Sequence, residues 1–306
     1  MPDYFPFDPN PRKPHTLPPP NSCDSQFHVL GPSEKYPPRP GAAYVMPSAT
    51  WEAALRMHKA LGIERGIIVQ PTTYGADHSA TLDGLAALGP DYKACANAAV
   101  LKERDDAYIA KLHQAGVRGA RFTRQGLGLG FSADEFARAV RRVKELGWYV
   151  KVQPEPEGIA GNAAMFEALD IPVLIDHMGR ADPAAGAADP NRTKLVELLR
   201  RGNFWVMLSL SEKLSKAGPP WDDVVPLARA LIEAAPDRVV WASDWPHPIS
   251  KKQPPNEADL LELLYRFAPD AATLKKILVD NPAQLFGFSE QDKAEANKVS
   301  PAAEKP

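Results

Sequence analysis

The sequence predicts a single α/β domain folded as a closed (β/α)8 barrel, or TIM barrel. Short runs rich in Val, Ile and Leu alternate with amphipathic stretches along most of the chain, as in a parallel sheet covered by helices. The alternation repeats as eight units, within the roughly 250 residues that one barrel needs. No Gly-x-Gly-x-x-Gly turn follows the first strand, which argues against an open dinucleotide-binding sheet.

The eight units can be placed one by one. Strands are expected where short apolar runs end at Gly, Pro or polar residues, at residues 23–30, 66–70, 92–100, 119–122, 148–153, 172–176, 204–209 and 239–243. Helices are expected where apolar residues recur every three to four positions, at residues 51–61, 78–88, 106–115, 133–146, 159–169, 192–201, 221–234 and 258–267. A last helix is expected at 271–278.

The two ends of the chain differ from this pattern. Many of the 32 prolines crowd the first fifty residues, so we interpret residues 1–20 as an extended arm. The arm either wraps a neighbouring subunit of a homo-oligomer or is unattached. Residues 21–288 form the barrel, and the polar residues 289–306 are predicted to be a flexible tail.

Bulk composition excludes several functions. A net charge of −2 provides no basic surface for nucleic acid or anionic lipid. No apolar run reaches the length of about 18 residues that a membrane span needs, and the amino-terminal residues lack the apolar core of a secretory signal. Two cysteines cannot build a disulfide framework, so a cytoplasmic location is expected.

The most informative segment is WASDWPHP, residues 241–248, in which Asp244 follows the last predicted strand. The carboxyl ends of barrel strands carry the active site. The alternative is that Asp244 only caps a turn. Other strand ends favour the catalytic interpretation, because they also bring polar side chains to the same mouth: Gln26, His28, Gln70, Thr72, Arg121, Arg124, Gln153, Glu155, Asp176, His177, Ser209, Glu212, Lys213 and His247.

An aspartate, two histidines and fixed cations suit hydrolysis of an ester-like carbonyl on an anionic substrate. Asp244 takes a proton from water, while His28 and His177 polarise the carbonyl. Arg121 and Arg124 hold a substrate carboxylate with their planar guanidinium groups, and Lys213 adds a point charge. The alternatives are that the histidines are structural and that the arginines are surface charges. Glu155 and Glu212 are expected to be solvated or paired with a lysine.

The motifs DSQFHVLGPSEKYP, VQPTTYGADH, GVRGARF, LIDHMGR, WASDWPHP and NPAQLFG resemble the amidohydrolase-2 branch of the amidohydrolase superfamily. Within that branch the chain is most similar to the pyrone-dicarboxylate, sulfomuconolactone and sugar-lactone enzymes. The resemblance covers about residues 22–288. It implies a barrel that hydrolyses a lactone C–O bond without a required metal.

The resemblance also implies roles for individual residues. Asp244 matches the water-activating aspartate, His177 the histidine of the sixth strand, and His28 the second histidine of a His-x-His pair. Tyr44, Thr72 and Arg121 fall at substrate-contacting positions. Lys213 stands where an arginine is common.

The departures from the family pattern concern the metal and the substrate. Gln26 replaces the first histidine of the pair, and an amide oxygen is a poor zinc ligand. We also expect strand alternation to turn Lys151 away from the site. A zinc or other divalent metal site is therefore disfavoured, and Gln26 is expected to donate to the lactone carbonyl instead. Gln153 replaces an expected tyrosine, which points to a substrate other than the pyrone dicarboxylate.

The sequence thus predicts a lactonase of aromatic or sugar-acid breakdown that acts on a small anionic lactone without a cofactor. Three alternatives stay open. They are a lactone isomerase on the same scaffold, a metal-dependent decarboxylase or amidase, and a non-catalytic barrel that binds a carboxylate.

Overall fold

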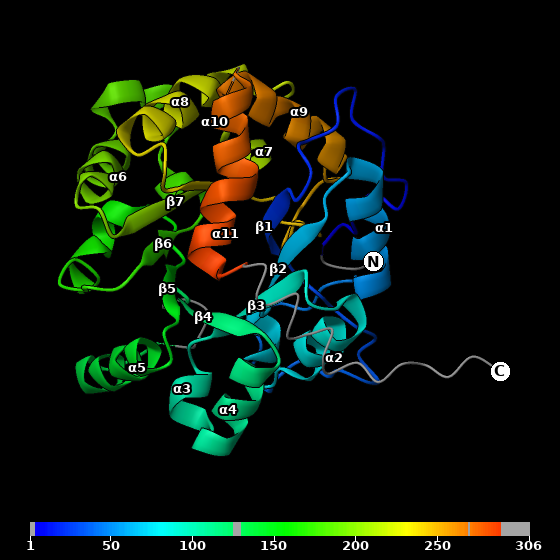
Figure 1. Ribbon diagram of the computed structural model, residues 1–306, viewed down its shortest axis with the longest axis vertical. Coiled ribbons are helices and arrows are strands. Elements are labelled where there is room, and N and C mark those ends of the chain that lie inside the picture. The colour runs from blue at the N-terminus through cyan, green and yellow to red at the C-terminus, as the bar shows by residue number, and fades with distance from the viewer. Residues whose placement is uncertain (1–3, 125–129, 269, 289–306) are drawn as a thin grey trace.

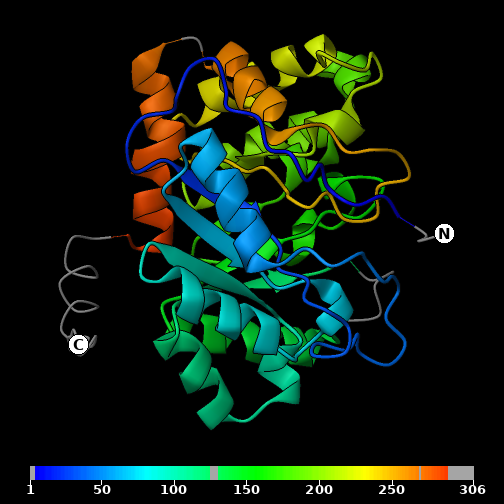
Figure 2. The same cartoon turned by 90° about the vertical axis from the view of Figure 1, so that its right-hand side faces the viewer.

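The computed structural model describes residues 4–124, 130–268 and 270–288. Within them, eight parallel strands follow one another around a barrel in sequence order, and helices surround it (Figures 1 and 2). The strands are β1 (Cys23–Phe27), β2 (Arg65–Val69), β3 (Tyr92–Asn97), β4 (Val117–Phe122), β5 (Tyr149–Val152), β6 (Val173–Ile175), β7 (Phe204–Leu208) and β8 (Val239–Trp241). The prediction of a (β/α)8 barrel is confirmed. The predicted tail, residues 289–306, lies outside the described residues.

Most of the longer helices lie close to their predicted positions. The helices are α1 (Trp51–Leu61), α2 (Ser79–Leu88), α3 (Val100–Glu103), α4 (Asp106–Gln114), α5 (Ala133–Glu145), α6 (Pro190–Arg200), α7 (Ser211–Leu214), α8 (Val225–Ala234), α9 (Glu257–Phe267), α10 (Ala271–Lys275) and α11 (Asn281–Phe286). The short helices α3, α7 and α11 were not predicted. Local signals set their ends. Ser132 and Glu135 form a capping box at the start of α5, and Gly62 ends α1 with φ 78°. None of the described helices is long and apolar enough to cross a membrane.

One predicted helix is wrong. Residues 159–169 do not form a continuous helix but two short 3-10 turns, Ile159–Gly161 and Ala163–Met165. The apolar residues Ile159, Ala163 and Phe166 are buried at helix-like spacing. However, a glycine and an asparagine at positions 161 and 162 interrupt the segment, and both residue types disfavour a helix interior.

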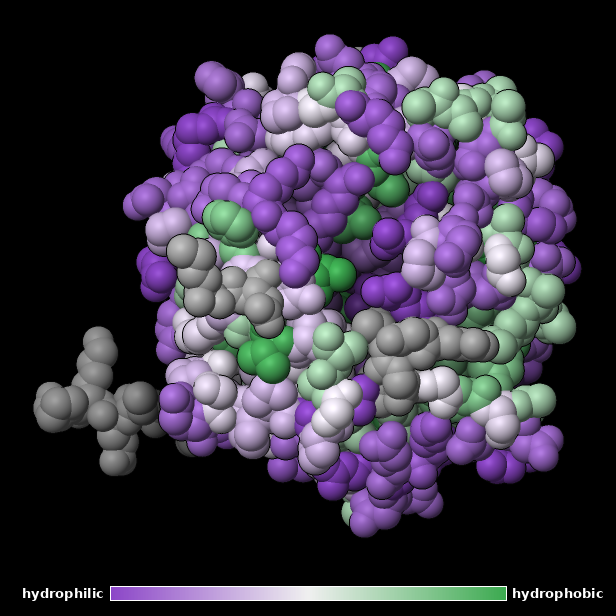
Figure 3. Space-filling view, turned by 180° about the vertical axis from the view of Figure 1, so that it is seen from behind, coloured by the Kyte–Doolittle hydropathy of each residue, from purple (hydrophilic) through white to green (hydrophobic). Residues whose placement is uncertain are grey.

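The interior of the barrel and its outer layer form separate hydrophobic clusters. The inner cluster takes alternate strand residues such as Val69, Cys95, Leu174 and Met207, because successive strand side chains point to opposite faces. α11 covers the amino-terminal end of the strands, where the Asn281 side chain donates to the carbonyl of Val239. The opposite end, at the back of the molecule in Figure 1, is hollowed near its centre in Figure 3. Of the two ends of the barrel, only the mouth at the carboxyl ends of the strands is therefore open to a ligand.

The first and last strands are joined beside Asp244. The Asp244 N–H donates to the Gln26 carbonyl at 3.1 Å, and the His28 N–H donates to the Trp245 carbonyl at 2.8 Å. These hydrogen bonds lie at the carboxyl ends of β1 and β8, so closing the barrel brings the segment around Gln26 and His28 next to the segment around Asp244.

The amino-terminal arm packs on its own barrel, which was not among the predicted alternatives. Phe7 packs against Trp245 with ring centroids 4.6 Å apart, and the Phe5 N–H donates to the Ser250 carbonyl at 2.9 Å. Farther along, the Arg12 side chain contacts Glu262 of α9. The arm therefore lies over the segment that follows β8.

Candidate active site

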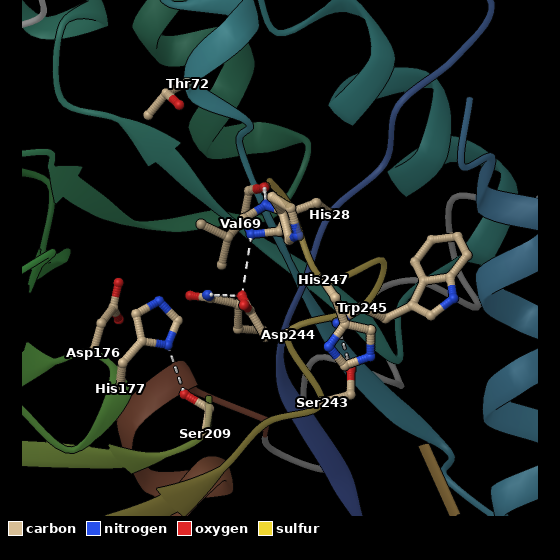
Figure 4. A network of polar contacts seen from close by, with 12 residues as sticks. His28, Val69, Thr72, Asp176, His177, Ser209, Ser243, Asp244, Trp245 and His247 are labelled. Atoms are coloured by element: carbon tan, nitrogen blue, oxygen red, sulfur yellow. Dashed lines mark hydrogen bonds and ion pairs between the residues drawn. The ribbon is translucent and has the colours of Figure 1, made fainter. Parts of the chain in front are cut away.

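Asp244 lies in the barrel mouth, three residues after the end of β8. Its Oδ1 accepts a hydrogen bond of 2.6 Å from the Gln26 side-chain nitrogen and lies 3.5 Å from His28 Nε2 (Figure 4). Burial raises the pKa of this carboxyl, but the electrostatic interaction with His177, the hydrogen bond of His28 and the charge of Lys213 outweigh it, so the pKa falls well below its usual value. Asp244 is therefore ionised at neutral pH although it is buried.

His28 is fixed in one tautomer by the backbone. Its Nδ1 lies 2.7 Å from the carbonyl oxygen of Val69, and because a carbonyl only accepts, Nδ1 carries the proton. The other ring nitrogen, Nε2, then faces Asp244 (Figure 4). The arrangement leaves Nε2 available to bind water or share a proton beside the carboxylate.

His177 lies across the pocket from His28 and is neutral. Its Nδ1 is 2.9 Å from the hydroxyl oxygen of Ser209. Burial lowers the pKa of His177 to about 4, more than the charges of Asp244 and Asp176 raise it. If Ser209 donates to Nδ1, Nε2 keeps its proton and becomes a hydrogen-bond donor.

Gln26 does not lie where we expected it. It is completely buried behind Asp244 and is absent from the lining of the cavity. Its amide nitrogen donates to Asp244, so the position of Gln26 does not support the predicted hydrogen bond to a lactone carbonyl. Its side-chain oxygen has no hydrogen-bond partner among the described residues.

The other predicted site residues line a cavity that opens to solvent. The lining contains every predicted catalytic or substrate-binding residue except Gln26: Asp244, His28, His177, Arg121, Arg124, Tyr44, Thr72, Gln153 and Lys213. The strand ends therefore bring these side chains together, and their individual roles stay predictions.

Two lining residues are bound to each other. The Thr72 hydroxyl donates to the Tyr44 hydroxyl oxygen at 2.8 Å, and burial raises the pKa of Tyr44. Tyr44 is therefore a neutral phenol at neutral pH, able to donate to a ligand oxygen.

Arg121 is not a free cation. Its Nε and Nη2 lie 2.8 and 2.7 Å from Oδ2 of Asp176. The other oxygen of Asp176 lies 2.6 Å from Nζ of Lys151, and both of these groups are fully buried. Two basic side chains therefore share the Asp176 carboxylate, and burial lowers the pKa of Lys151.

The side chain of Lys151 thus does not point in the direction that we expected. Residues 151 and 153 are two apart on one strand, so both side chains point to the same face. Our assignment of Lys151 to the opposite face was wrong. Lys151 lies inside the barrel, one layer below Gln153.

The structure adds a cation that the sequence analysis missed. Arg180 lines the cavity and follows His177 in a turn where His177, Met178 and Arg180 all have φ near +50°. The sequence feature that could have indicated Arg180 is the arginine that ends the LIDHMGR segment. Strand periodicity does not reach it, because this turn lies beyond the end of β6.

His247 and Glu212 were expected at the mouth but do not line the cavity. His247 is fully buried outside the cavity, on the other side of Asp244 from His177 (Figure 4). Its Nδ1 lies 3.2 Å from Glu212 and its Nε2 lies 3.3 Å from Glu257. The expectation that Glu212 is solvated or paired with a lysine is therefore wrong.

The donor set around Asp244 fits a divalent metal poorly. The amide nitrogen of Gln26, which is not a metal ligand, contacts the Asp244 oxygen, and Gln26 stands where the resemblance implies a histidine. No group of three or more His, Cys, Asp or Glu side chains in the described part of the chain is arranged to hold a metal ion.

Comparisons with known proteins agree on one family. The amidohydrolase family pattern matches residues 20–288. The chain is 38% identical to the 4-sulfomuconolactone hydrolase of Hydrogenophaga intermedia, over 88% of this chain and 89% of that protein. It is 35% identical to the 2-pyrone-4,6-dicarboxylate hydrolase of Comamonas testosteroni, over 90% of this chain and 93% of that protein. It is 30% identical to the D-galactarolactone isomerase of Agrobacterium fabrum, over 92% and 94%.

A solved structure supports the same placement. A protein of Agrobacterium tumefaciens, crystallised in its apo form, superposes with a TM-score of 0.78 at 29% identity, covering 90% of this chain and 99% of its own. Together with the family match over most of the chain, these similarities mean that the protein belongs to the amidohydrolase family.

Proposed function

We propose that the protein is a lactonase that hydrolyses the cyclic ester of a small lactone carrying acidic groups. The observation that carries the proposal is the ionised carboxylate of Asp244, buried beside two imidazoles under a cationic rim. Relatives named as hydrolases of sulfomuconolactone and of pyrone dicarboxylate support it.

The proposed reaction begins with a water molecule held between Asp244 and the lactone carbonyl carbon. Asp244 accepts a proton from this water as its oxygen attacks that carbon. The carbonyl oxygen becomes an oxyanion, which accepts a hydrogen bond from Nε2 of His177.

The tetrahedral intermediate then collapses. The bond between the carbonyl carbon and the ring oxygen breaks, and the leaving oxygen takes the proton that Asp244 had accepted. Nε2 of His28 lies 3.5 Å from Asp244 and is placed to pass this proton on. The product is an open-chain hydroxy acid or its keto tautomer, with one oxygen from solvent.

The cations of the rim are proposed to hold the acidic groups of the substrate. Arg124, Arg180 and Lys213 line the cavity, and Arg121, which is bound to Asp176, lines it as well. Guanidinium groups bind carboxylates and sulfonates through paired N–H donors.

The proposal includes no metal or cofactor, which follows from the donor set described above and stays to be tested. The direct test is a screen of lactone carboxylates and sulfonates for acid release, with and without chelator. We expect at least one lactone to be opened at the same rate in both conditions. Loss of activity in chelator that zinc restores would contradict the metal-free reaction, and failure to open any lactone would contradict the proposed function.

A second candidate is isomerisation of a lactone, which the relative named D-galactarolactone isomerase favours. The same base and carbonyl donors serve if a substrate hydroxyl replaces water as nucleophile. Reaction in water enriched in ¹⁸O separates the two, because hydrolysis adds one labelled oxygen to the product and isomerisation adds none.

A further inference from the structure

The segment that carries Asp244 is held in an unusual backbone conformation. Asp244, His247 and Ile249 all have φ close to +60°, which residues with a Cβ adopt only when their surroundings hold them there. The His247 N–H donates to the Asp244 carbonyl at 2.7 Å, so the turn is a closed unit. The direction of the Asp244 carboxylate depends on this turn.

The side chain of His247 anchors the turn from behind. It is fully buried and lies between two buried carboxylates, those of Glu212 in α7 and Glu257 at the start of α9. Ionised carboxylates only accept hydrogen bonds, and each ring nitrogen faces one of them, so the geometry requires an imidazolium that donates from both nitrogens. Burial lowers the pKa of His247, but Glu212 and Glu257 outweigh it and raise that pKa to about 9.

The same cluster reaches the cavity wall. Lys213, next to Glu212, lines the cavity and donates from Nζ to the Pro248 carbonyl at 2.9 Å. The turn after β8 is therefore tied to α7 by two contacts, Glu212 with His247 and Lys213 with Pro248. These contacts connect His247 both to the proposed base and to a proposed anion-binding residue.

We propose that His247 is a positioning residue, whose clamping between Glu212 and Glu257 aims the Asp244 carboxylate and the Lys213 ammonium into the cavity. His247 does not touch the cavity itself. It acts through the backbone of residues 244–248. The effect on turnover rests on the proposed lactone hydrolysis, but the state of the cluster does not.

The cluster has a defined dependence on pH. Glu212 from α7 and Glu257 from α9 act directly on His247. Lys213 from α7 and Asp244 from the same turn act on Glu212. Below the pKa of His247 the imidazolium bridges both carboxylates. Above it, a neutral ring donates to only one of them, and the two carboxylates repel each other. We therefore expect kcat to fall as the pH rises through about 9.

The experiment compares His247→Gln and Glu257→Gln with the unmodified enzyme. His247→Gln should lower kcat at least tenfold, with near-ultraviolet circular dichroism retained, and should remove the alkaline fall near pH 9. Glu257→Gln leaves a single carboxylate partner, so the alkaline fall should move to lower pH. His113→Gln is the matched control, because His113 accepts from the Trp148 indole N–H outside the cavity, and it should leave both kcat and the profile unchanged.

A second readout needs no substrate. In protein labelled with ¹³C-histidine, the resonance that is missing from His247→Gln should titrate near pH 9 in the unmodified enzyme and lower in Glu257→Gln. A resonance that titrates near 6.5 would overturn the clamp. If the titration supports the clamp but His247→Gln leaves kcat and the pH profile unchanged, the positioning role is overturned. If no lactone is opened, only the proposed function fails, and the titration still decides the clamp.

Discussion

Gln26 shows how one hydrogen bond changes the role of a residue. From its residue type and its position in the sequence, we expected Gln26 to contact the substrate directly. Instead, its amide nitrogen donates to Asp244 at 2.6 Å. Whether a side-chain amide points to the pocket or to its neighbour depends on the joint between β1 and β8, which sequence spacing does not specify.

The first prediction concerns this hydrogen bond. Gln26→Met keeps the size of the side chain but removes the donor to an ionised carboxylate, an interaction of about 1.5–3 kcal/mol. We expect kcat to fall by about tenfold to a hundredfold with little change in KM, because Gln26 does not line the cavity. The acid limb of the pH profile should move to higher pH, since the pKa of Asp244 rises. A variant with unchanged kcat and acid limb would show that Gln26 has no effect on the base.

Arg180 is the cation that the sequence analysis did not single out. Arg180→Gln should raise KM about tenfold, on the order of one charge-assisted hydrogen bond, and leave kcat almost unchanged, because it removes binding shared by the ground state and the transition state. Arg229→Gln is the matched control, since that guanidinium donates to the Arg266 carbonyl outside the cavity. An equal fall in kcat and kcat/KM with KM unchanged would contradict the anchoring role.

At the scale of elements, strands such as β6 and β8 were predicted well because each is a short apolar run with polar residues soon after it. Asp176 directly follows β6, and Ser243 and Asp244 lie just beyond β8. The segment after β5 was not predicted well, because buried residues of short 3-10 turns repeat at a spacing close to that of a helix. Side chains beyond a strand end, such as Arg180 and His247, follow turn geometry and need the structure.

The start of α2 gives a prediction about stability. His78 Nε2 accepts from the Asn97 N–H at 3.2 Å, so the folded protein holds this ring neutral, and burial lowers its pKa to about 4. His177 is similar, with its pKa also lowered to about 4 by burial. Both values lie below the value of about 6.5 for an unfolded chain.

Because the unfolded chain binds these two protons first, stability should fall as the pH drops from about 6.5 to about 4. Each histidine contributes on the order of 3 kcal/mol to this loss. Urea unfolding at a series of pH values measures it, and His78→Gln should flatten the dependence. A midpoint that stays constant from pH 6.5 to pH 4 would contradict the neutral, buried histidines.

At the scale of the whole molecule, the barrel brings residues 26, 28, 121, 177 and 244 to one mouth although they are far apart in the chain. This gathering was predictable, because parallel strands in a closed barrel end at one face. The packing of the arm on the barrel was not predictable, because a proline-rich segment has no periodicity that marks a packed face. Its contacts are specific, and include a hydrogen bond from the Tyr265 hydroxyl to the Thr16 carbonyl.

The arm gives a prediction for the molecule as a unit. Phe7 packs on Trp245, next to Asp244, so Phe7→Ala should lower Tm by a few degrees through lost burial and also lower kcat. Phe5→Ala is the matched control, because 45% of Phe5 is exposed, and it should change neither. Thermal unfolding and steady-state rates measure both variants. Equal behaviour of the two would show that the packing of Phe7 on Trp245 does not support the site.

The account depends most on Asp244 as the group that activates water. The direct measurement is the turnover of Asp244→Asn on a lactone that the unmodified enzyme opens, with circular dichroism to verify the fold. Loss of a general base predicts a fall in kcat on the order of a thousandfold, while the hydrogen bond between the Asp244 N–H and the Gln26 carbonyl keeps the barrel closed. A variant that retains turnover within tenfold of the unmodified enzyme would contradict the mechanism.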